Sequence, residues 1–377
     1  MSEDRPLRVA VLVKRYVFTG GSERYAVELT RRLVQRGFVV DLFCREHDPD
    51  LVQEINSVIK VPDRGGFSSI ASAMAFAKDC KLLLQNHNYD VIHSHERGYS
   101  QDILTVHTFT WKAGTRAFQP IKRFFRYWIT PRHHLYSWLE KRQMQTPHLV
   151  AVSNIIAKDI ADNYPTSGQS HVISPGVDVE IFTPKYIQTH RSESRQSAGL
   201  PDKAFVVLFV GNEFRRKGLD DLIPALGDGM VLLVAGQGER LEHYLYLAKD
   251  HGVADRVRFL GLVTDVRPLY AMADVVVLPS LREGFGMVML ETMACGLPVI
   301  VRDSVGAAGL VNHGVNGLRF SQQSELKSLL AELAVDSELQ LKISRSARLT
   351  AQQQTWDHIA DKYADLYRFV AAAKTIT

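Results

Sequence analysis

Cysteine is scarce in this sequence. Only three cysteines occur among 377 residues, Cys44, Cys80 and Cys295. They share neither the spacing of metal ligands nor an even number that could form a disulfide framework. This scarcity is typical of proteins in a reducing compartment, so we expect a cytoplasmic location.

Long apolar runs are also missing. Stretches such as residues 206–210 and 231–235 are far too short to cross a bilayer. The polar, acidic start Met1-Ser2-Glu3-Asp4 is unlike a secretory signal peptide. We therefore expect any contact with a membrane to be peripheral.

An excess of charge is absent as well. The formal net charge is +4, from 45 Lys and Arg against 41 Asp and Glu, which argues against bulk binding of nucleic acid. The apolar fraction of 46% and the charged fraction of 23% are those of a globular protein. A chain of this length predicts two domains.

Strand and helix patterns alternate along the chain, which favours doubly wound α/β domains. The apolar runs are read as buried parallel strands. In the first half they lie at residues 7–13, 39–43 and 91–93, with a helix over 69–85; in the second half, at 205–210, 231–234, 257–260 and 275–278.

The pattern restarts after Pro175-Gly176-Val177-Asp178, and we interpret the polar run 188–196 as a loop between the halves. The predicted domains are residues 1–172 and 173–355, followed by an amphipathic helix over 356–377 that packs back on the first domain. Two such domains facing a central cleft would bind ligands beyond the carboxyl ends of their strands.

The stretch 279–291 carries the strongest chemical signal. It follows a strand, turns on Gly284 and Gly286, and enters a helix, so backbone N–H groups face an anion at the helix start. Glu283 and Glu291 can accept hydrogen bonds from sugar hydroxyls. The alternative is a surface turn with a solvated Glu and a helix-stabilising Glu.

This stretch resembles the donor site of the retaining glycosyltransferases of family four, which have the GT-B fold. The two glutamates stand eight positions apart around Gly-Phe-Gly, and residues 293–298 read Met-Ala-Cys-Gly-Leu-Pro. The resemblance implies that Glu283 meets the donor sugar, that Glu291 binds the ribose, and that donor oxygens are bound by the amides of Gly284, Phe285, Gly286 and Met287.

A basic pair follows another strand, in the loop 211–218. Arg216 and Lys217 would stabilise the negative charge that grows on a departing diphosphate, and the resembling family has a basic pair in this loop. Many members carry Arg where this chain has Asn212, and Arg215 is a weaker candidate. The alternative is a solvated basic turn.

Two further positions are implied by the resemblance. Gly20 and Gly21 permit close approach of backbone to a ligand at the start of a helix, and the family places this loop at the donor phosphates. His107 follows a predicted strand end, where the family has a histidine lining the reaction centre; the alternative is a histidine with a purely structural role. The implied catalytic residues are thus Glu283, His107, Arg216 and Lys217.

A metal or other cofactor is not expected. Asp102 and the cluster His93-Ser94-His95-Glu96 could suggest a metal site, but no Asp-x-Asp accompanies them. GT-B enzymes generally act without a bound metal, so we expect the nucleotide sugar to act as a co-substrate and no cofactor to be needed.

From Trp111 to Arg142 the sequence is basic and aromatic, with Glu140 as its single acid. This composition is typical of docking on an anionic membrane. A basic helical face over an aromatic core is the alternative; RNA binding is a third reading without a supporting fold. The first loop, residues 14–21, and this stretch resemble the lipopolysaccharide core glucosyltransferases, which work at the inner face of the cell membrane.

We therefore predict a retaining hexosyltransferase that moves glucose from a UDP-sugar to a glycolipid or oligosaccharide, in the heptose region of a lipopolysaccharide core. A nucleotide-sugar 2-epimerase is the alternative. The sequence leaves open the donor sugar, the base (UDP, GDP or ADP), the acceptor, the linkage position and the oligomeric state.

Overall fold

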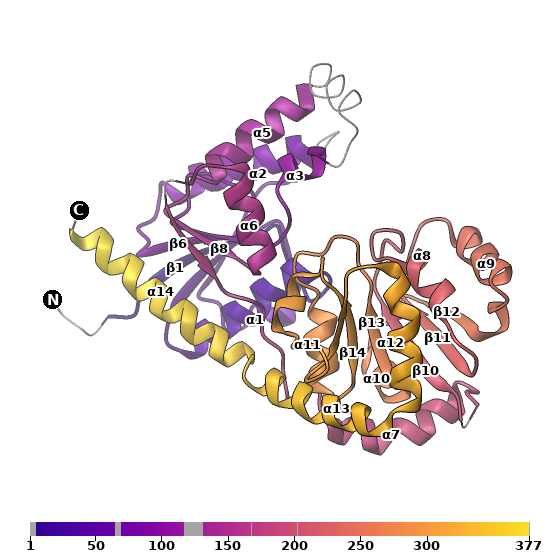
Figure 1. Ribbon diagram of the computed structural model, residues 1–377. Coiled ribbons are helices and arrows are strands. Elements are labelled where there is room, and N and C mark those ends of the chain that lie inside the picture. Colours follow the sequence, from indigo (N-terminus) through magenta and orange to yellow (C-terminus); the bar gives the residue numbers. More distant parts are fainter. Residues whose placement is uncertain (1–4, 65–68, 117–130, 167, 202, 377) are drawn as a thin grey trace. The chain divides into compact units, whose positions relative to one another are not determined.

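A computed structural model describes residues 5–64, 69–116, 131–166, 168–201 and 203–376 (Figure 1). The chain forms two compact units. Unit 1 consists of Met1–Pro175 and Trp356–Thr377, and unit 2 consists of Gly176–Thr355. The border after Pro175 lies close to the boundary that the sequence predicts, and each unit is described by itself below.

Unit 1 is built on a parallel sheet in the order β5-β3-β1-β6-β7-β8-β9. Its strands are β1 (Arg8–Leu12), β3 (Val39–Cys44), β5 (Ser57–Lys60), β6 (Val91–Ser94), β7 (Ile103–Val106), β8 (His148–Ala151) and β9 (Gln169–Val172). The short strands β2 (Arg15–Tyr16) and β4 (Glu46–His47) pair separately. The central strands are apolar because helices cover both faces of such a sheet.

The helices of unit 1 are α1 (Gly21–Gln35), α2 (Ser69–Leu84), α3 (Trp111–Arg116), α5 (Pro131–Gln143), α6 (Asn154–Asn163) and α14 (Trp356–Ile376). The C-terminal helix α14 lies against α1 (Figure 1). Its apolar face is buried, with Trp356, Ile359, Tyr363, Tyr367 and Val370 turned inward. Arg36 of α1 binds Asp357 and Asp361 on the rim of this contact.

Unit 2 contains a second parallel sheet, in the order β12-β11-β10-β13-β14-β15. Its strands are β10 (Phe205–Val210), β11 (Met230–Ala235), β12 (Val257–Gly261), β13 (Val275–Leu278), β14 (Val299–Arg302) and β15 (Leu318–Phe320). In both sheets the order of the strands reverses at the first strand, between β1 and β6 and between β10 and β13, which is the Rossmann arrangement.

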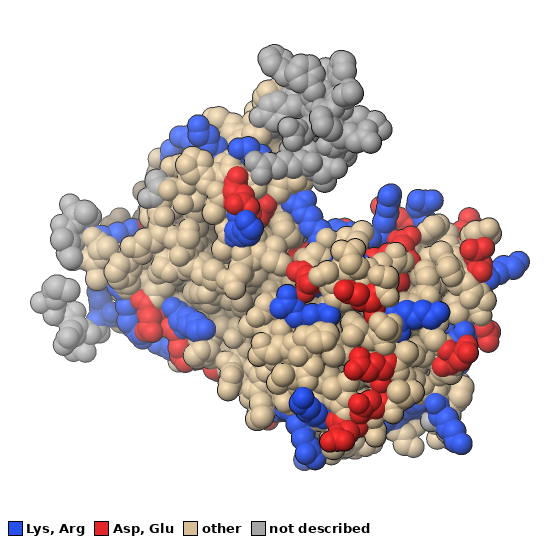
Figure 2. Space-filling model, in the orientation of Figure 1, with Lys and Arg blue, Asp and Glu red and all other residues tan. Residues whose placement is uncertain are grey.

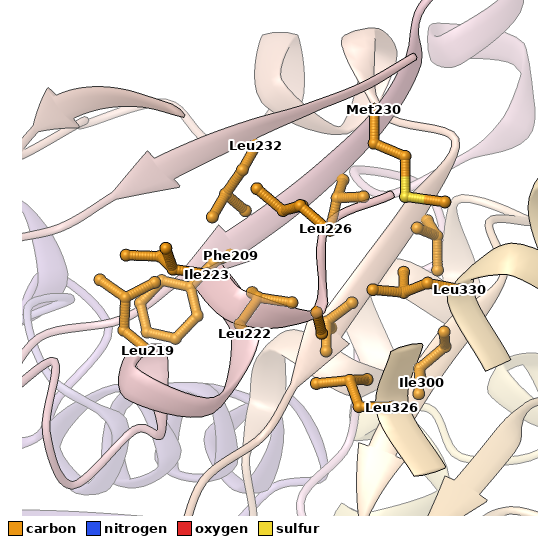
Figure 3. Packing of buried hydrophobic residues seen from close by; sticks show 14 of the residues in the cluster. Phe209, Leu219, Leu222, Ile223, Leu226, Met230, Leu232, Ile300, Leu326 and Leu330 are labelled. Atoms are coloured by element: carbon orange, nitrogen blue, oxygen red, sulfur yellow. The ribbon is translucent and has the colours of Figure 1, made fainter. Parts of the chain in front are cut away.

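The helices of unit 2 are α7 (Pro184–Ser197), α8 (Leu219–Leu222), α9 (Leu241–Asp250), α10 (Arg267–Met272), α11 (Met287–Ala294), α12 (Gln323–Val335) and α13 (Ser337–Gln352). Figure 3 shows how Leu219 and Leu222 of α8 pack with Phe209, Ile300 and Leu326. This core fixes the segment that follows the loop after β10.

The prediction of a loop over residues 188–196 is wrong, because this run lies within α7. Thr183 and Pro184 start the helix, as expected for an N-cap residue and a proline at the first helical position. Arg191 and Arg195, one turn apart, both bind Asp274. Two of the polar side chains are thus held by ion pairs, which a hydrophobic pattern does not reveal.

No helix within the described ranges is long and apolar enough to span a bilayer. On the face of unit 2 seen in Figure 2, Lys and Arg side chains are interspersed with Asp and Glu side chains. The charges on that face therefore form no broad field of one sign.

Candidate active site

The point where strand order reverses is where ligands bind in open α/β sheets, beyond the carboxyl ends of the strands. In unit 2 this point lies between β10 and β13. The loop 211–218 leaves β10 and the turn 279–286 leaves β13. The two segments with the strongest sequence signals therefore flank the same reversal point.

These two segments are in direct contact. The amide of Leu281 donates to the carbonyl of Arg216 at 3.0 Å. Gly218 has a φ of +78°, and a Cβ there would lie 2.1 Å from the carbonyl oxygen of Pro279. Only glycine allows this approach, so the close packing of loop and turn depends on that position.

The loop after β10 is also anchored by the loop after β11. Phe214 is buried, and a Cβ on Gly238 would lie 2.2 Å from its ring. Asn212, where many family members have Arg, accepts a hydrogen bond at Oδ1 from the amide of Gln237 at 2.7 Å. Asn212 thus ties this loop to the loop after β11.

The charged side chains of loop and turn converge on one carboxylate. Lys217 Nζ donates to Glu283 Oε2 at 2.5 Å, and Arg216 Nη1 donates to the same oxygen at 3.1 Å. Arg216 also donates to the Arg282 carbonyl at 3.0 Å and, through Nε, to Glu213 at 2.6 Å. Glu213 has no role in the sequence prediction; its spacing of three residues from Arg216 was the available signal.

The turn itself leads into α11. Gly286 precedes the helix with a φ of +92°, a conformation that favours glycine. The carbonyls of Glu283 and Phe285 accept hydrogen bonds from Gly306 and Ala307 at 3.0 and 2.9 Å. The turn is therefore held from its outer side, and the helix that starts at Met287 directs the positive end of its dipole to the same edge.

Glu291 lies one level deeper, on the buried face of α11. Its Oε2 accepts a hydrogen bond from the Tyr270 hydroxyl at 2.7 Å. Tyr270 is a site neighbour that the sequence prediction missed, because it comes from α10 and no local pattern links the two residues. A buried carboxylate held in this way keeps a fixed orientation.

In unit 1 the corresponding edge carries the loop after β1. Gly20 caps α1 with a φ of +97°, and an added Cβ would lie 2.5 Å from Glu23 Oε2. At Gly21 an added Cβ would meet no described atom within 4 Å. Gly20 is thus required by the turn, whereas an added Cβ at Gly21 would meet open space among the described residues.

His107 follows β7 at this edge and is held by a second histidine. His95 Nδ1 and His107 Nε2 lie 3.1 Å apart, at hydrogen-bonding distance. Burial lowers the pKa of His107 to about 3, and that of His95 also falls well below its usual value. Both rings are therefore neutral at physiological pH, and His95, a weaker candidate in the sequence, is the partner of His107.

Other polar residues of this region have structural contacts. His93 binds Tyr367 and Thr105 at 2.5 and 2.8 Å. Asp102 accepts hydrogen bonds from the Ile92 amide at 2.7 Å and from Lys374 at 2.6 Å. Across the described residues, no three His, Cys, Asp or Glu side chains gather as a metal site.

The basic, aromatic stretch is described only at its two ends. Its residues Lys122, Arg123, Phe124, Phe125 and Arg126 lie outside the described residues.

Within α5, aromatic side chains point both inward and outward. Tyr136 is buried and stacks on Trp111, with ring centres 4.4 Å apart, whereas Trp138 is 44% exposed. Glu140, the single acid, is buried and accepts hydrogen bonds from the Trp111 amide and the Tyr164 hydroxyl. One end of the stretch thus combines an aromatic core contact with an exposed aromatic.

Each of the two units matches a known family of proteins. The model "Glycosyl transferases group 1" matches residues 190–350, and "Glycosyltransferase Family 4" matches residues 19–181. A D-inositol 3-phosphate glycosyltransferase from Geodermatophilus obscurus is 31% identical, over 93% of this chain and 85% of its own length. The chain belongs to the group 1 glycosyltransferases.

This glycosyltransferase therefore transfers a sugar from a nucleotide-sugar donor. A second relative of the same name, from Salinispora tropica, is 29% identical over 92% of this chain and 80% of its own length. Nothing in the comparisons supports the epimerase alternative.

Solved structures show that the glycosyltransferase has the GT-B fold with two Rossmann-like domains. WaaG, a glycosyltransferase of lipopolysaccharide biosynthesis, aligns with a TM-score of 0.82 at 23% identity, covering 95% of this chain and 99% of WaaG. HepE from Anabaena, solved with UDP and glucose, aligns with a TM-score of 0.73 at 21% identity, covering 96% and 99%. At these identities the likeness shows the fold alone.

Proposed function

We propose that this glycosyltransferase is a hexosyltransferase. It moves glucose from UDP-glucose to an acceptor hydroxyl with retention of the anomeric configuration. The observation that supports this proposal best is the convergence of Lys217 and Arg216 on Glu283, beside the turn that opens α11. Cations for a diphosphate and a carboxylate for sugar hydroxyls then stand together at the reversal point of the sheet.

Lys217 and Arg216 stabilise the departing diphosphate. Negative charge grows on the phosphate oxygens as the sugar leaves, and fixed cations that are already in place stabilise that charge without reorganisation. The hydrogen bond from Arg216 Nη1 to the Arg282 carbonyl holds its guanidinium against the turn. The transfer then requires no bound metal or other cofactor.

The proposed donor site uses a carboxylate, backbone amides and glycines. Glu291 accepts hydrogen bonds from the ribose hydroxyls, oriented by Tyr270. The amides of Gly284, Phe285, Gly286 and Met287 bind sugar and phosphate oxygens. In unit 1, the family resemblance assigns Gly20 and Gly21, at the start of α1, to the donor phosphates.

Retention follows without a covalent intermediate. In the proposed reaction the Glu283 carboxylate accepts hydrogen bonds from the sugar hydroxyls and does not attack, and the acceptor hydroxyl attacks the anomeric carbon from the face that the diphosphate leaves. A phosphate oxygen takes the proton. Neutral His107 lines the reaction centre and forms a hydrogen bond with the sugar.

The proposed acceptor is the heptose region of a lipopolysaccharide core, presented as a glycolipid or oligosaccharide. The resemblance of the first loop and of the basic, aromatic stretch to the core glucosyltransferases supports it. D-inositol 3-phosphate is a second candidate acceptor, because relatives named for it are 29% and 31% identical over nearly the whole chain.

We also propose that the protein is cytoplasmic and binds the inner face of the cell membrane through the stretch from Trp111 to Arg142. Exposed Trp138, with Lys141 and Arg142 on the same helix, supports this assignment. Arg142 stacks over Trp138 at 5.1 Å, which places a cation and an indole ring together, as interfacial surfaces often do.

A direct assay tests the proposed function. The protein is incubated with labelled UDP-, GDP- and ADP-glucose, each with a heptose-terminated core oligosaccharide, with D-inositol 3-phosphate, or with no acceptor. We expect label to enter the core oligosaccharide from UDP-glucose. Transfer to D-inositol 3-phosphate alone would replace the acceptor, and absence of transfer from any nucleotide sugar would contradict the proposed reaction.

A further inference from the structure

We propose that Glu283 makes this site select the sugar-loaded nucleotide over the free nucleoside diphosphate, by competing with the phosphates for Lys217 and Arg216. The inference rests on the proposed function, because it takes those two cations as the phosphate ligands. It adds to that function a difference in affinity: the site binds the nucleotide-sugar donor in preference to the nucleoside diphosphate that remains after transfer.

The geometry shows a carboxylate that already holds both cations. Lys217 Nζ lies 2.5 Å and Arg216 Nη1 lies 3.1 Å from the same oxygen, Glu283 Oε2. The side chains of Lys217 and Glu283 are only 18% and 17% exposed. Water therefore screens this ion pair little, and a phosphate must displace a strong partner to reach Lys217.

Separating Glu283 from Lys217 and Arg216 costs free energy, and the cost depends on which groups then bind the carboxylate. When a diphosphate draws Lys217 and Arg216 away, the mostly buried Glu283 carboxylate loses charged partners, and an unpaired buried carboxylate is unfavourable. Hydroxyl groups of a donor sugar can donate to it in their place. Free nucleoside diphosphate carries no sugar at this position, so the cost stays uncompensated and its binding is weakened.

Glu213 provides a matched comparison on the same guanidinium. It binds Arg216 through Nε at 2.6 Å, but its side chain is 66% exposed. When the Glu213 carboxylate is removed, water can replace it at Arg216 Nε. The bonds that Arg216 makes through Nη1 are not affected. Removal of this second carboxylate should therefore have no bearing on the choice between loaded and free nucleotide.

Calorimetry on the full chain tests the inference. Dissociation constants for UDP and for UDP-glucose are measured with the unchanged protein and with the Glu283→Gln and Glu213→Gln variants. We expect Glu283→Gln to bind UDP about three- to tenfold more tightly, because its cations are released, and to bind UDP-glucose no more tightly than before. Glu213→Gln should leave the ratio of the two constants unchanged.

The outcomes separate this inference from the proposed function. Suppose that UDP binds the unchanged protein and that melting shows the Glu283→Gln variant to be folded. If this variant then binds UDP equally well or more weakly, the competition is refuted and the proposed function stands. An equal gain for UDP in Glu213→Gln would also overturn it, since charge alone would then explain the effect. If UDP, GDP and ADP all fail to bind any variant, the function and the inference fall together.

Discussion

At the scale of single residues, the ion cluster around Glu283 carries the proposed donor chemistry. Glu283, Arg216 and Lys217 are each predictable as residue types from their loops, but their mutual pairing is not, because the lysine and the glutamate lie 66 positions apart. The contact forms only when parallel strands bring the two loops to one edge. For the same reason Tyr270 carries no sequence signal as the partner of Glu291.

Lys217→Ala and Arg216→Ala should each lower turnover by roughly two to three orders of magnitude, as the loss of a fixed charge stabiliser does. Arg216→Ala should change the melting temperature little, because its side chain is 41% exposed, whereas Lys217→Ala should lower it, because Glu283 then loses a mostly buried partner. Steady-state kinetics with UDP-glucose measures the effect. Near-normal turnover in both single variants and in the double variant would refute the assignment of leaving-group stabilisation to these cations.

Glu291→Ala should weaken binding of plain UDP, because the ribose hydroxyls lose a charged acceptor, which costs about 1.5–3 kcal/mol. Tyr270→Phe is the matched control: it removes the 2.7 Å hydrogen bond that orients the carboxylate but keeps the carboxylate itself, so a smaller loss is expected. Calorimetry measures both. A folded Glu291→Ala variant with unchanged affinity would exclude the ribose role.

At the scale of elements, β6, β7 and α14 share a buried polar layer. His93 of β6 binds Thr105 of β7 and Tyr367 of α14, and Tyr363 of α14 binds both Thr105 and Tyr25. The amphipathic pattern of the last helix is readable from sequence, whereas this network is not. Conversely, α7 has one buried side chain, Ile187. Its arginines Arg191 and Arg195 attach it to Asp274.

This polar layer predicts a pH dependence of stability. Burial lowers the pKa of His93 and of His107 to about 3, against about 6.5 in an unfolded chain. Between pH about 6.5 and about 3 the unfolded chain binds more protons than the folded one. The unfolding free energy should therefore fall as pH decreases through this range and rise as pH increases. Urea unfolding at a series of pH values measures the slope, and His93→Gln should reduce it. A slope of opposite sign would contradict neutral buried histidines.

At the scale of the whole molecule, the two Rossmann-like repeats are the part that the sequence predicts best. Buried parallel strands are continuous apolar runs, and those runs recur in both halves of the chain. The acceptor and the proposed membrane-binding surface are harder to predict, because exposed side chains obey no packing pattern. On α5, Tyr136 and Trp138 are two positions apart, yet one is buried and the other exposed.

Membrane binding should require anionic lipid and should weaken with added salt, since salt screens charges over about 8–10 Å. Lys141→Gln with Arg142→Gln should reduce co-sedimentation with anionic vesicles. Trp138→Ser should do the same without changing the melting temperature, whereas Tyr136→Ser should lower the melting temperature instead. Equal binding to neutral and anionic vesicles would return the stretch to a purely structural role.

The most direct test of the account is the stereochemistry of the product. The protein is incubated with UDP-glucose, in which the sugar is α-linked, and with a heptose-terminated core oligosaccharide, and the new anomeric proton is followed by NMR. The account predicts release of UDP with formation of an α-glucosidic bond. A β-linked product, or a sugar altered at C2 without transfer to the oligosaccharide, would contradict it.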